Sequence, residues 1–346
     1  MKKKTGKIAV PRYEELLKPV RYNMVLAGIP FEQNPKATTR YYVLWITLFV
    51  MIIGEVAFMV NVTSEKFLEL TALVPCTAIG FLSLTKTTFI YRNRNSAMDL
   101  VKRLEILYLQ YRNEQKWMSL VGDDVNFVRS LTVSYVILNQ MLVWTYNLSS
   151  LILMIYTYLV ENRLVYVLPY PVALPFEVNS WFRWSVVYLY SVANAFVTVL
   201  NFCTVDCFYY ILTCLICTNF AILNARIKEL SSETSEDLLE LIKDHQYLLK
   251  LSSQLETIFT GPNLLNVLIG SLQICVLGFN LTIGGWEQAP PSLLFISSVL
   301  LQILMMSMFG EKLIEQSSET GASVYSCAWT SMDAKSRKLL MIMQRR

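Results

Sequence analysis

Few side chains in this sequence could carry out chemistry: some cysteines in apolar segments, one histidine and three isolated charges. Cys203, Cys207, Cys214 and Cys217 have spacings that put several thiols on related faces of one helix, as a metal site would need. The only histidine is His245, and no cluster of acidic ligands accompanies the thiols. Because buried thiols more often act as small packing groups, we expect no metal site.

Other catalytic arrangements are also missing from the sequence. It contains no glycine-rich phosphate loop, no nucleophile elbow and no convincing pair of carboxylates. A single histidine completes neither a zinc site nor an obvious cysteine–histidine nucleophile pair. We therefore predict that the protein is not an enzyme, uses no cofactor and binds no nucleic acid.

The three isolated charges are Glu55, Lys86 and Asp206, each inside an apolar segment, where a charge is by default a functional candidate. If the first segment runs outward and the second inward, Glu55 lies near the outer surface and Lys86 near the inner one. Their depths then differ by roughly 15 Å, so they do not pair. We expect Glu55 to face water or a polar neighbour, Lys86 to extend to the inner interface, and Asp206 to lie at the cytoplasmic boundary.

Composition indicates the class of element that carries these residues. Hydrophobic residues make up 54% of the chain and charged residues 16%, with a mean hydropathy of +0.42, which is typical of an integral membrane protein. Spanning the hydrocarbon takes ~20 apolar residues as a helix. The unbroken apolar runs predict an all-α, polytopic helical bundle and not a barrel. The six predicted spans are Tyr41–Val60, Leu70–Ile90, Leu131–Val160, Trp184 to about Leu223, Leu264–Ile283 and Ser292–Phe309.

The positions of lysine and arginine predict the orientation of these spans. Basic residues concentrate in 1–40, in the loop 91–130 and in the loop 224–263, whereas the loops 61–69 and 161–183 hold few. The basic regions belong on the cytoplasmic side of the lipid bilayer, so the N-terminus is expected in the cytoplasm.

The fourth span predicts structure outside the membrane, because about 40 helical residues measure roughly 60 Å, twice the hydrocarbon thickness. After it, residues 224–262 form an amphipathic pattern, with apolar positions at Leu238, Leu241, Leu248, Leu255 and Phe259. We expect a cytoplasmic bundle, either buried within one subunit or used for subunit contact. The predicted regions are 1–40 (cytoplasmic), 41–223 (four spans), 224–262 (amphipathic helix), 263–310 (two spans) and 311–346 (cytoplasmic tail).

A pocket for a small apolar ligand is expected in the outer halves of spans two to four, where aromatic and aliphatic walls are combined with a few polar groups. Each of these side chains has helix packing as an alternative role. The candidate ligand-binding residues are Thr71, Thr77, Phe81, Tyr146, Ser149, Ser150, Tyr156, Tyr190 and Asn194.

The last part of the sequence is the most distinctive, FGEKLIEQSSETGASVYSCAWTSMDAKSRKLLMIMQRR, with Gly310, Glu315, Tyr325 and Trp329. A run from Asp206 to Leu223, a run from His245 to Phe259 and the loop LPYPVALPFE accompany it. With these motifs the second half of the sequence resembles the insect odorant receptors, and the resemblance extends more loosely over nearly the whole chain.

The resemblance implies a seven-helix receptor in the plasma membrane of a sensory neuron, with a cytoplasmic N-terminus. A small volatile ligand in the outer half of the bundle would open a non-selective cation channel in a tetramer formed with a co-receptor. Tyr325 and Trp329 would contribute to subunit contacts. In the family, the segment resembling DAKSRKLLMIMQRR leads into a pore-lining helix, so this chain is expected to hold six of seven transmembrane helices.

Four alternatives remain open at the level of sequence. They are a gustatory-type receptor of the same architecture, a non-functional truncated receptor, a G-protein-coupled receptor and a small transporter. A G-protein-coupled receptor would start outside the cell, against the charge pattern. A transporter is expected to show internal repeats with broken helices, and none is evident in the sequence.

Overall fold

The computed structural model describes residues 11–29, 35–61, 67–231, 237–283 and 285–344 of the chain. Within this part, six helices are long and apolar enough to cross a membrane, which confirms the six predicted spans. These are α2 (Pro35–Asn61), α3 (Phe67–Arg92), α5 (Gln115–Glu161), α6 (Trp181–Lys228), α7 (Leu238–Ile283) and α8 (Gly285–Ser326). Shorter elements are α1 (Tyr13–Leu26), α4 (Arg94–Arg112), the 3-10 turn η3 (Trp329–Ser331) and α9 (Ala334–Gln344).

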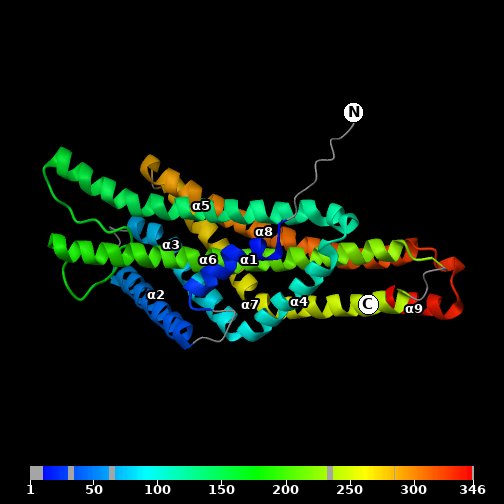
Figure 1. The fold of residues 1–346 in the computed structure, drawn as a ribbon. Helices are drawn as coiled ribbons and strands as arrows, with labels where there is room; N and C mark the ends of the chain where they lie inside the picture. The colour runs from blue at the N-terminus through cyan, green and yellow to red at the C-terminus, as the bar shows by residue number, and fades with distance from the viewer. Residues whose placement is uncertain (1–10, 30–34, 62–66, 232–236, 284, 345–346) are drawn as a thin grey trace.

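Four of the helices are far longer than a bilayer is thick. α5 to α8 contain 47, 48, 46 and 42 residues, so each measures roughly 60 to 70 Å, about twice the hydrocarbon core. Figure 1 shows them running together along an elongated bundle, with the loop 162–180 at one end and α9 at the other. We call the end that carries α9 and α4 the basic end, and the opposite one the loop end.

α6 is the central helix of the bundle. It contacts seven other helices, α1, α2, α3, α4, α5, α7 and α8. In its most apolar window 89% of the residues are buried, against 17 to 56% for the other five spans. A helix buried all round must be apolar all round, which explains why the sequence of α6 shows no amphipathic stripe.

The amphipathic segment and the fifth span form one continuous helix, α7, with Pro262 inside it. All five apolar positions predicted from its spacing, from Leu238 to Phe259, are 3% exposed or less. The bundle at the basic end therefore buries them within a single chain. α8 likewise runs without a break from Gly285 to Ser326, so the expected boundaries at 262 and 310 lie inside continuous helices.

Side chains that donate hydrogen bonds to backbone carbonyls hold α1 and α4 in place at the basic end. Tyr13 of α1 donates a hydrogen bond to the carbonyl of Val101 at 2.6 Å, and Gln254 of α7 donates to the carbonyl of Ser96 at 2.8 Å. Gln254 also bonds Asp99 of α4, whose carboxyl accepts a further bond from Arg103. The hydrogen bond from the Arg103 guanidinium holds the pKa of Asp99 below its usual value.

Within the apolar part, α7 supplies side chains that satisfy backbone groups of α3. Pro75 has no N–H, so the carbonyl of Thr71, one turn before it, lacks its helical donor. The amide of Asn280 donates to that carbonyl at 2.9 Å, and Gln273 donates to the carbonyl of Pro75 at 3.0 Å. The pairing fixes α3 and α7 at one register.

One carboxylate, that of Asp206 on α6, binds side chains from four other helices. Lys86 of α3 lies 2.8 Å from Oδ1 and 2.9 Å from Oδ2. Tyr135 of α5 and Gln302 of α8 donate to Oδ2 at 2.9 and 2.8 Å, and Asn266 of α7 donates to Oδ1 at 3.3 Å. We call these five residues the Asp206 network, and none of them is more than 3% exposed.

The Asp206 network corrects one prediction. Lys86 does not extend to the inner interface: it is 0% exposed, and its ammonium lies 3.6 Å from the centre of the Phe202 ring. Asp206, predicted at the cytoplasmic boundary, is 3% exposed and is the acceptor at the centre of the bundle. The predicted absence of an ion pair between Glu55 and Lys86 agrees with the structure, since Lys86 pairs with Asp206.

Replacing Lys86 with methionine is expected to destabilise the protein by about 3 to 5 kcal/mol, because it leaves the Asp206 carboxylate buried without its cation. Thermal unfolding of the purified protein in detergent would measure the loss. The matched control is the double variant Lys86→Met/Asp206→Asn, which removes both charges and is expected to recover much of the stability. A double variant less stable than the single one would contradict the role given to the charge.

Candidate ligand-binding site

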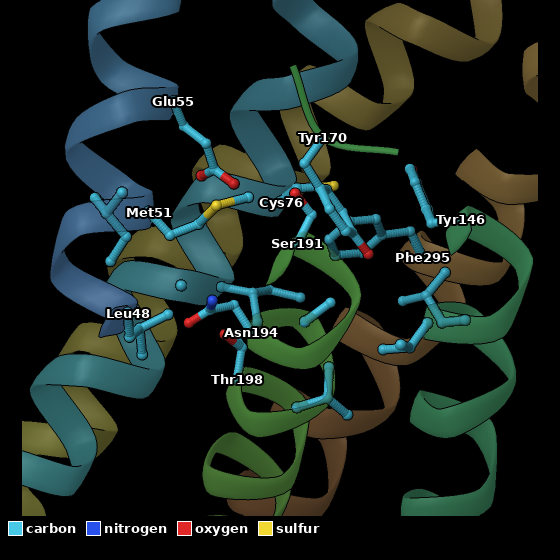
Figure 2. A pocket seen from close by; sticks show the side chains of 17 residues that line it. Leu48, Met51, Glu55, Cys76, Tyr146, Tyr170, Ser191, Asn194, Thr198 and Phe295 are labelled. Carbon is cyan, nitrogen blue, oxygen red and sulfur yellow. The ribbon is translucent and has the colours of Figure 1, made fainter. Parts of the chain in front are cut away.

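A cavity of about 60 Å³ lies between α2, α3, α5, α6 and α8 in the half of the bundle nearer the loop end. Its walls are mostly apolar, with a few polar groups, as small-molecule sites usually are. Figure 2 shows side chains from these helices and Tyr170 of the loop converging on it. The residues that line it are Leu48, Met51, Ile52, Glu55, Cys76, Ile79, Gly80, Leu142, Val143, Tyr146, Tyr170, Ser191, Asn194, Ala195, Thr198, Val199 and Phe295.

The cavity lies two helical turns from the Asp206 network on four helices at once. Lys86, Tyr135, Asp206 and Gln302 are each seven residues from a lining residue. Seven residues are close to two full turns, so the two residues of each pair share a helix face, roughly 10 Å apart along the axis. These lining residues are Ile79, Leu142, Val199 and Phe295.

Three aromatic side chains form one side of the cavity. Tyr146 of α5 stacks on Tyr170 of the loop, with ring centroids 6.4 Å apart. Phe295 of α8 meets Tyr146 edge to face at 6.1 Å. Because these rings come from two helices and a loop, they join the roof of the cavity to its walls.

Polar side chains of α2 and α6 line the cavity. Glu55 of α2 is 6% exposed, and its carboxyl lies near the hydroxyl of Thr77 on α3, which donates to the carbonyl of Leu73. On α6, the amide of Asn194 donates to the carbonyl of Tyr190, one turn earlier. The hydroxyl of Ser191 is fully buried and finds no hydrogen-bond partner within the described part of the chain.

The loop 162–180 covers part of the cavity through Tyr170. The N–H of Ala173 donates to the carbonyl of Gly54 at 3.0 Å, next to Glu55 in sequence, and the indole of Trp184 donates to the carbonyl of Val167 at 2.9 Å. The loop starts at Asn162, whose left-handed backbone (φ 53°) ends α5, and stops at Ser180, which caps α6. These contacts hold Tyr170 over the cavity at 8% exposure.

The structure brings two of the nine candidate residues, Tyr146 and Asn194, into the lining of this cavity. Phe81, Ser149 and Tyr156 are exposed on the outside of the bundle. The remaining four make other contacts. Thr71 accepts the bond from Asn280 through its carbonyl, Thr77 supports Glu55, Ser150 donates to the carbonyl of Asn147 and Tyr190 donates to the carbonyl of Thr47.

Sequence reasoning missed the contributions of α2, α8 and the loop, including Glu55, Tyr170 and Phe295. One signal pointed to Glu55, since it is an acidic residue inside an apolar span. Tyr170 belongs to the proline-rich segment LPYPVALPFE, whose rigidity suits a fixed lid. No local pattern marks Phe295, because the side of α8 that meets α5 depends on the assembled bundle.

The cysteines of α6 are packing groups. All four are buried, and the thiols of Cys207 and Cys214 point at carbonyls of α5, those of Thr132 and Asp124. His245 is buried against the Phe220 ring. Across the described ranges, no three histidine, cysteine or acidic side chains converge as metal ligands would.

The two residues predicted to make subunit contacts lie at the basic end. Tyr325 of α8 is 73% exposed and Trp329 of η3 is 38% exposed. Both line a hollow of about 420 Å³ beside α9. Within a single chain the Tyr325 side chain therefore remains largely uncovered, and that of Trp329 is partly covered.

Both the sequence and the fold are similar to those of known proteins. Residues 66–346 match the family model described as 7tm Odorant receptor. Odorant receptors 85c and 85b of Drosophila melanogaster are 26% and 25% identical to this chain; each match covers 86% of it, and 78% and 77% of the respective relative. Olfactory receptor OR5 of Machilis hrabei matches with a TM-score of 0.81 at 14% identity, over 97% of this chain and 90% of that one. A second structure of OR5, in complex with eugenol, matches with a TM-score of 0.80.

Replacing Ser191 with alanine is expected to leave the empty protein at least as stable as the parent. The hydroxyl has no partner to lose, and a buried unsatisfied polar group costs about 1 to 3 kcal/mol. Thermal unfolding in detergent would test this, with Thr320→Ala as the matched control, because the hydroxyl of Thr320 donates to Asn224 at 2.8 Å. A clear loss of stability in Ser191→Ala would contradict the assignment.

Proposed function

Because this chain belongs to the odorant receptor family, we propose that it is a receptor subunit that binds a small volatile ligand in the cavity between α2, α3, α5, α6 and α8. The protein is a multi-pass membrane protein, and its relatives are receptors and not enzymes. The observation that carries the proposal is a mostly apolar cavity between helices of the bundle, with Tyr170 of the loop 162–180 in its lining. The complex of OR5 with eugenol supports a small-molecule ligand for this fold.

The size of the cavity bears on how a ligand would act. Benzene occupies an apolar cavity of about 150 Å³, whereas this one measures about 60 Å³. A volatile molecule of that size or larger would enter only if side chains rotate or helices separate. Binding would then favour a wider arrangement of the lining helices, because a ligand shifts a conformational equilibrium by its differential affinity for the two states.

The Asp206 network offers a path for that change. Four lining helices carry a residue of the network two turns from the cavity, and Phe202, the residue whose ring lies below the Lys86 ammonium, is one turn from Thr198 and Val199. Helices joined by well-satisfied polar contacts move as units, not independently. We propose that expansion of the cavity is transmitted through these helices toward the basic end.

We further propose that the subunit works in the plasma membrane of a sensory neuron, in a tetramer with an odorant receptor co-receptor that forms a non-selective cation channel. The exposed rings of Tyr325 and Trp329 would be covered by a neighbouring subunit at the basic end. A gustatory-type role is not favoured, since the relatives found in both comparisons are odorant or olfactory receptors.

Co-expression of this chain with the co-receptor is expected to produce inward cation currents in response to a panel of volatile compounds, recorded by whole-cell patch clamp. Cells that express the co-receptor alone serve as the control. Silence of the co-expressed pair across a broad panel, with the protein present at the cell surface, would contradict the receptor role.

Tyr146 and Ser149 of α5 provide a matched pair of variants, because only Tyr146 lines the cavity. Tyr146→Leu is expected to raise the half-maximal concentration of an active compound about tenfold or more, which corresponds to ~1.4 kcal/mol of lost contact. Ser149→Ala, whose hydroxyl bonds the carbonyl of Tyr146 on the outer surface, is expected to change it less than about twofold. Equal effects of the two variants, at equal surface expression, would place the ligand elsewhere.

The charge pattern also predicts the topology of the chain in the membrane. An epitope at the N-terminus is expected to bind its antibody only after the cells are permeabilised, while an epitope inserted into the loop 162–180 binds without permeabilisation. Staining of the N-terminal epitope on intact cells would reverse the orientation and move the cavity to the cytoplasmic half.

A further inference from the structure

Resting on the ligand-binding role of the cavity, we propose that its ligand is a small apolar amine, with the ammonium group against Glu55 and the apolar part against Tyr146, Tyr170 and Phe295. This names a chemical class of ligand that neither the family nor the shape of the bundle specifies.

Glu55 is a buried carboxyl directed into the cavity. Its side chain comes from α2, is 6% exposed and points toward Cys76 and Ser191 in Figure 2. The neutral hydroxyl of Thr77, which donates to the carbonyl of Leu73 at 3.3 Å, lies near its carboxyl. The ion pairs found in the described part of the chain all use other carboxylates, so Glu55 has no cationic partner there.

The contrast with Asp206 shows what Glu55 lacks. Asp206 is buried to a similar degree, yet it has a lysine and three neutral donors within hydrogen-bonding distance. A buried carboxylate is stabilised by such partners, and without them its desolvation costs several kcal/mol. At Glu55 a positively charged donor brought by the ligand would supply the partner that Lys86 supplies to Asp206.

The opposite wall of the cavity suits the rest of such a ligand. Tyr146, Tyr170 and Phe295 offer ring faces and edges, and a cation within about 6 Å of a ring centroid is attracted by its quadrupole. An apolar chain or ring also packs favourably on these side chains and on Leu142 and Val143. A carboxylate on one side and aromatic rings on the other are the groups that recognise organic ammonium ions.

No lining residue of the cavity carries a positive charge, since the 17 lining residues include no lysine, arginine or histidine. Lys86, the buried cation nearest along α3, is held by Asp206 two turns away. An entering ammonium group therefore meets no like charge in the lining. By the same reasoning a carboxylic acid would be disfavoured, because it would place two carboxylates in one small apolar cavity.

The test uses the full chain in lipid nanodiscs and measures ligand-dependent thermal stabilisation. The probes are three amines, butylamine, hexylamine and 2-phenylethylamine, and the alcohols of matched shape. We expect at least one amine to bind about tenfold more tightly than its matched alcohol, as a charge-assisted contact in a buried site implies. Glu55→Gln is expected to abolish this preference, leaving the affinity of the alcohol within about threefold of its parental value.

Two controls separate the charge of Glu55 from its structural role. Glu55→Asp keeps the carboxylate and is expected to keep the preference for amines, in a protein that still unfolds near the parental temperature. Glu161→Gln removes a carboxylate that is exposed at the outer end of α5 and is expected to leave all affinities unchanged. Loss of the preference in Glu161→Gln would attribute it to surface charge and overturn the proposal.

The remaining outcomes distinguish this inference from the function on which it rests. If the alcohols bind in the cavity but no amine binds more tightly, or if Glu55→Gln keeps the preference, the amine proposal fails and the ligand-binding role stands. If neither amines nor alcohols stabilise the parent protein, and Tyr146→Leu does not alter any odour-evoked current, the proposed cavity function fails and the amine proposal fails with it.

Discussion

The architecture depends on the buried carboxylate of Asp206, which joins five helices at one depth. Inside an apolar bundle no water is available to replace a missing partner, so the geometry that satisfies Asp206 is strongly preferred over any other. Lys86, Tyr135, Asn266 and Gln302 reach it only when α3, α5, α7 and α8 have particular axial positions and rotations about α6. The same positions then determine which side chains face one another two turns away, where the cavity lies. The polar network thus sets the register of the lining, although none of its members lines the cavity.

Local residue patterns correctly predicted part of the fold. Unbroken apolar runs identified the six spans, and helical spacing identified the buried face of α7, including Leu248 and Phe259. Sequence reasoning missed the pairing of Lys86 with Asp206 because they are 120 residues apart and meet only through tertiary packing. Counting residues from the start of the fourth span predicts a depth for Asp206 but not the side chains that surround it.

The candidate site was predictable only in part, for a related physical reason. Tyr146 and Asn194 were identified because they combine suitable depth with a suitable side chain. Ser149, three residues after Tyr146, satisfies the same criteria but lies on the outer surface, since a helix face is assigned by its neighbours and not by its own sequence. Phe295 and Tyr170 belong to segments far away in the chain. Their convergence requires α8 to pack beside α5 and the loop 162–180 to be bonded to Gly54.

The two buried carboxylates of the bundle carry different consequences for function. A fully bonded group such as Asp206 resists change, because any movement of one helix breaks contacts with several others. Glu55, which has one neutral neighbour, leaves a favourable interaction unmade in the empty state. A ligand that supplies the missing partner of Glu55 binds more tightly for that reason. The helices that it displaces are joined to one another near Asp206. The helices are held together at Asp206, and Glu55 lacks a charged partner at the cavity. Together these features form an arrangement in which binding of a small molecule can displace long helices. The same two features, seen separately, would be only a stability element and an unfavourable buried charge.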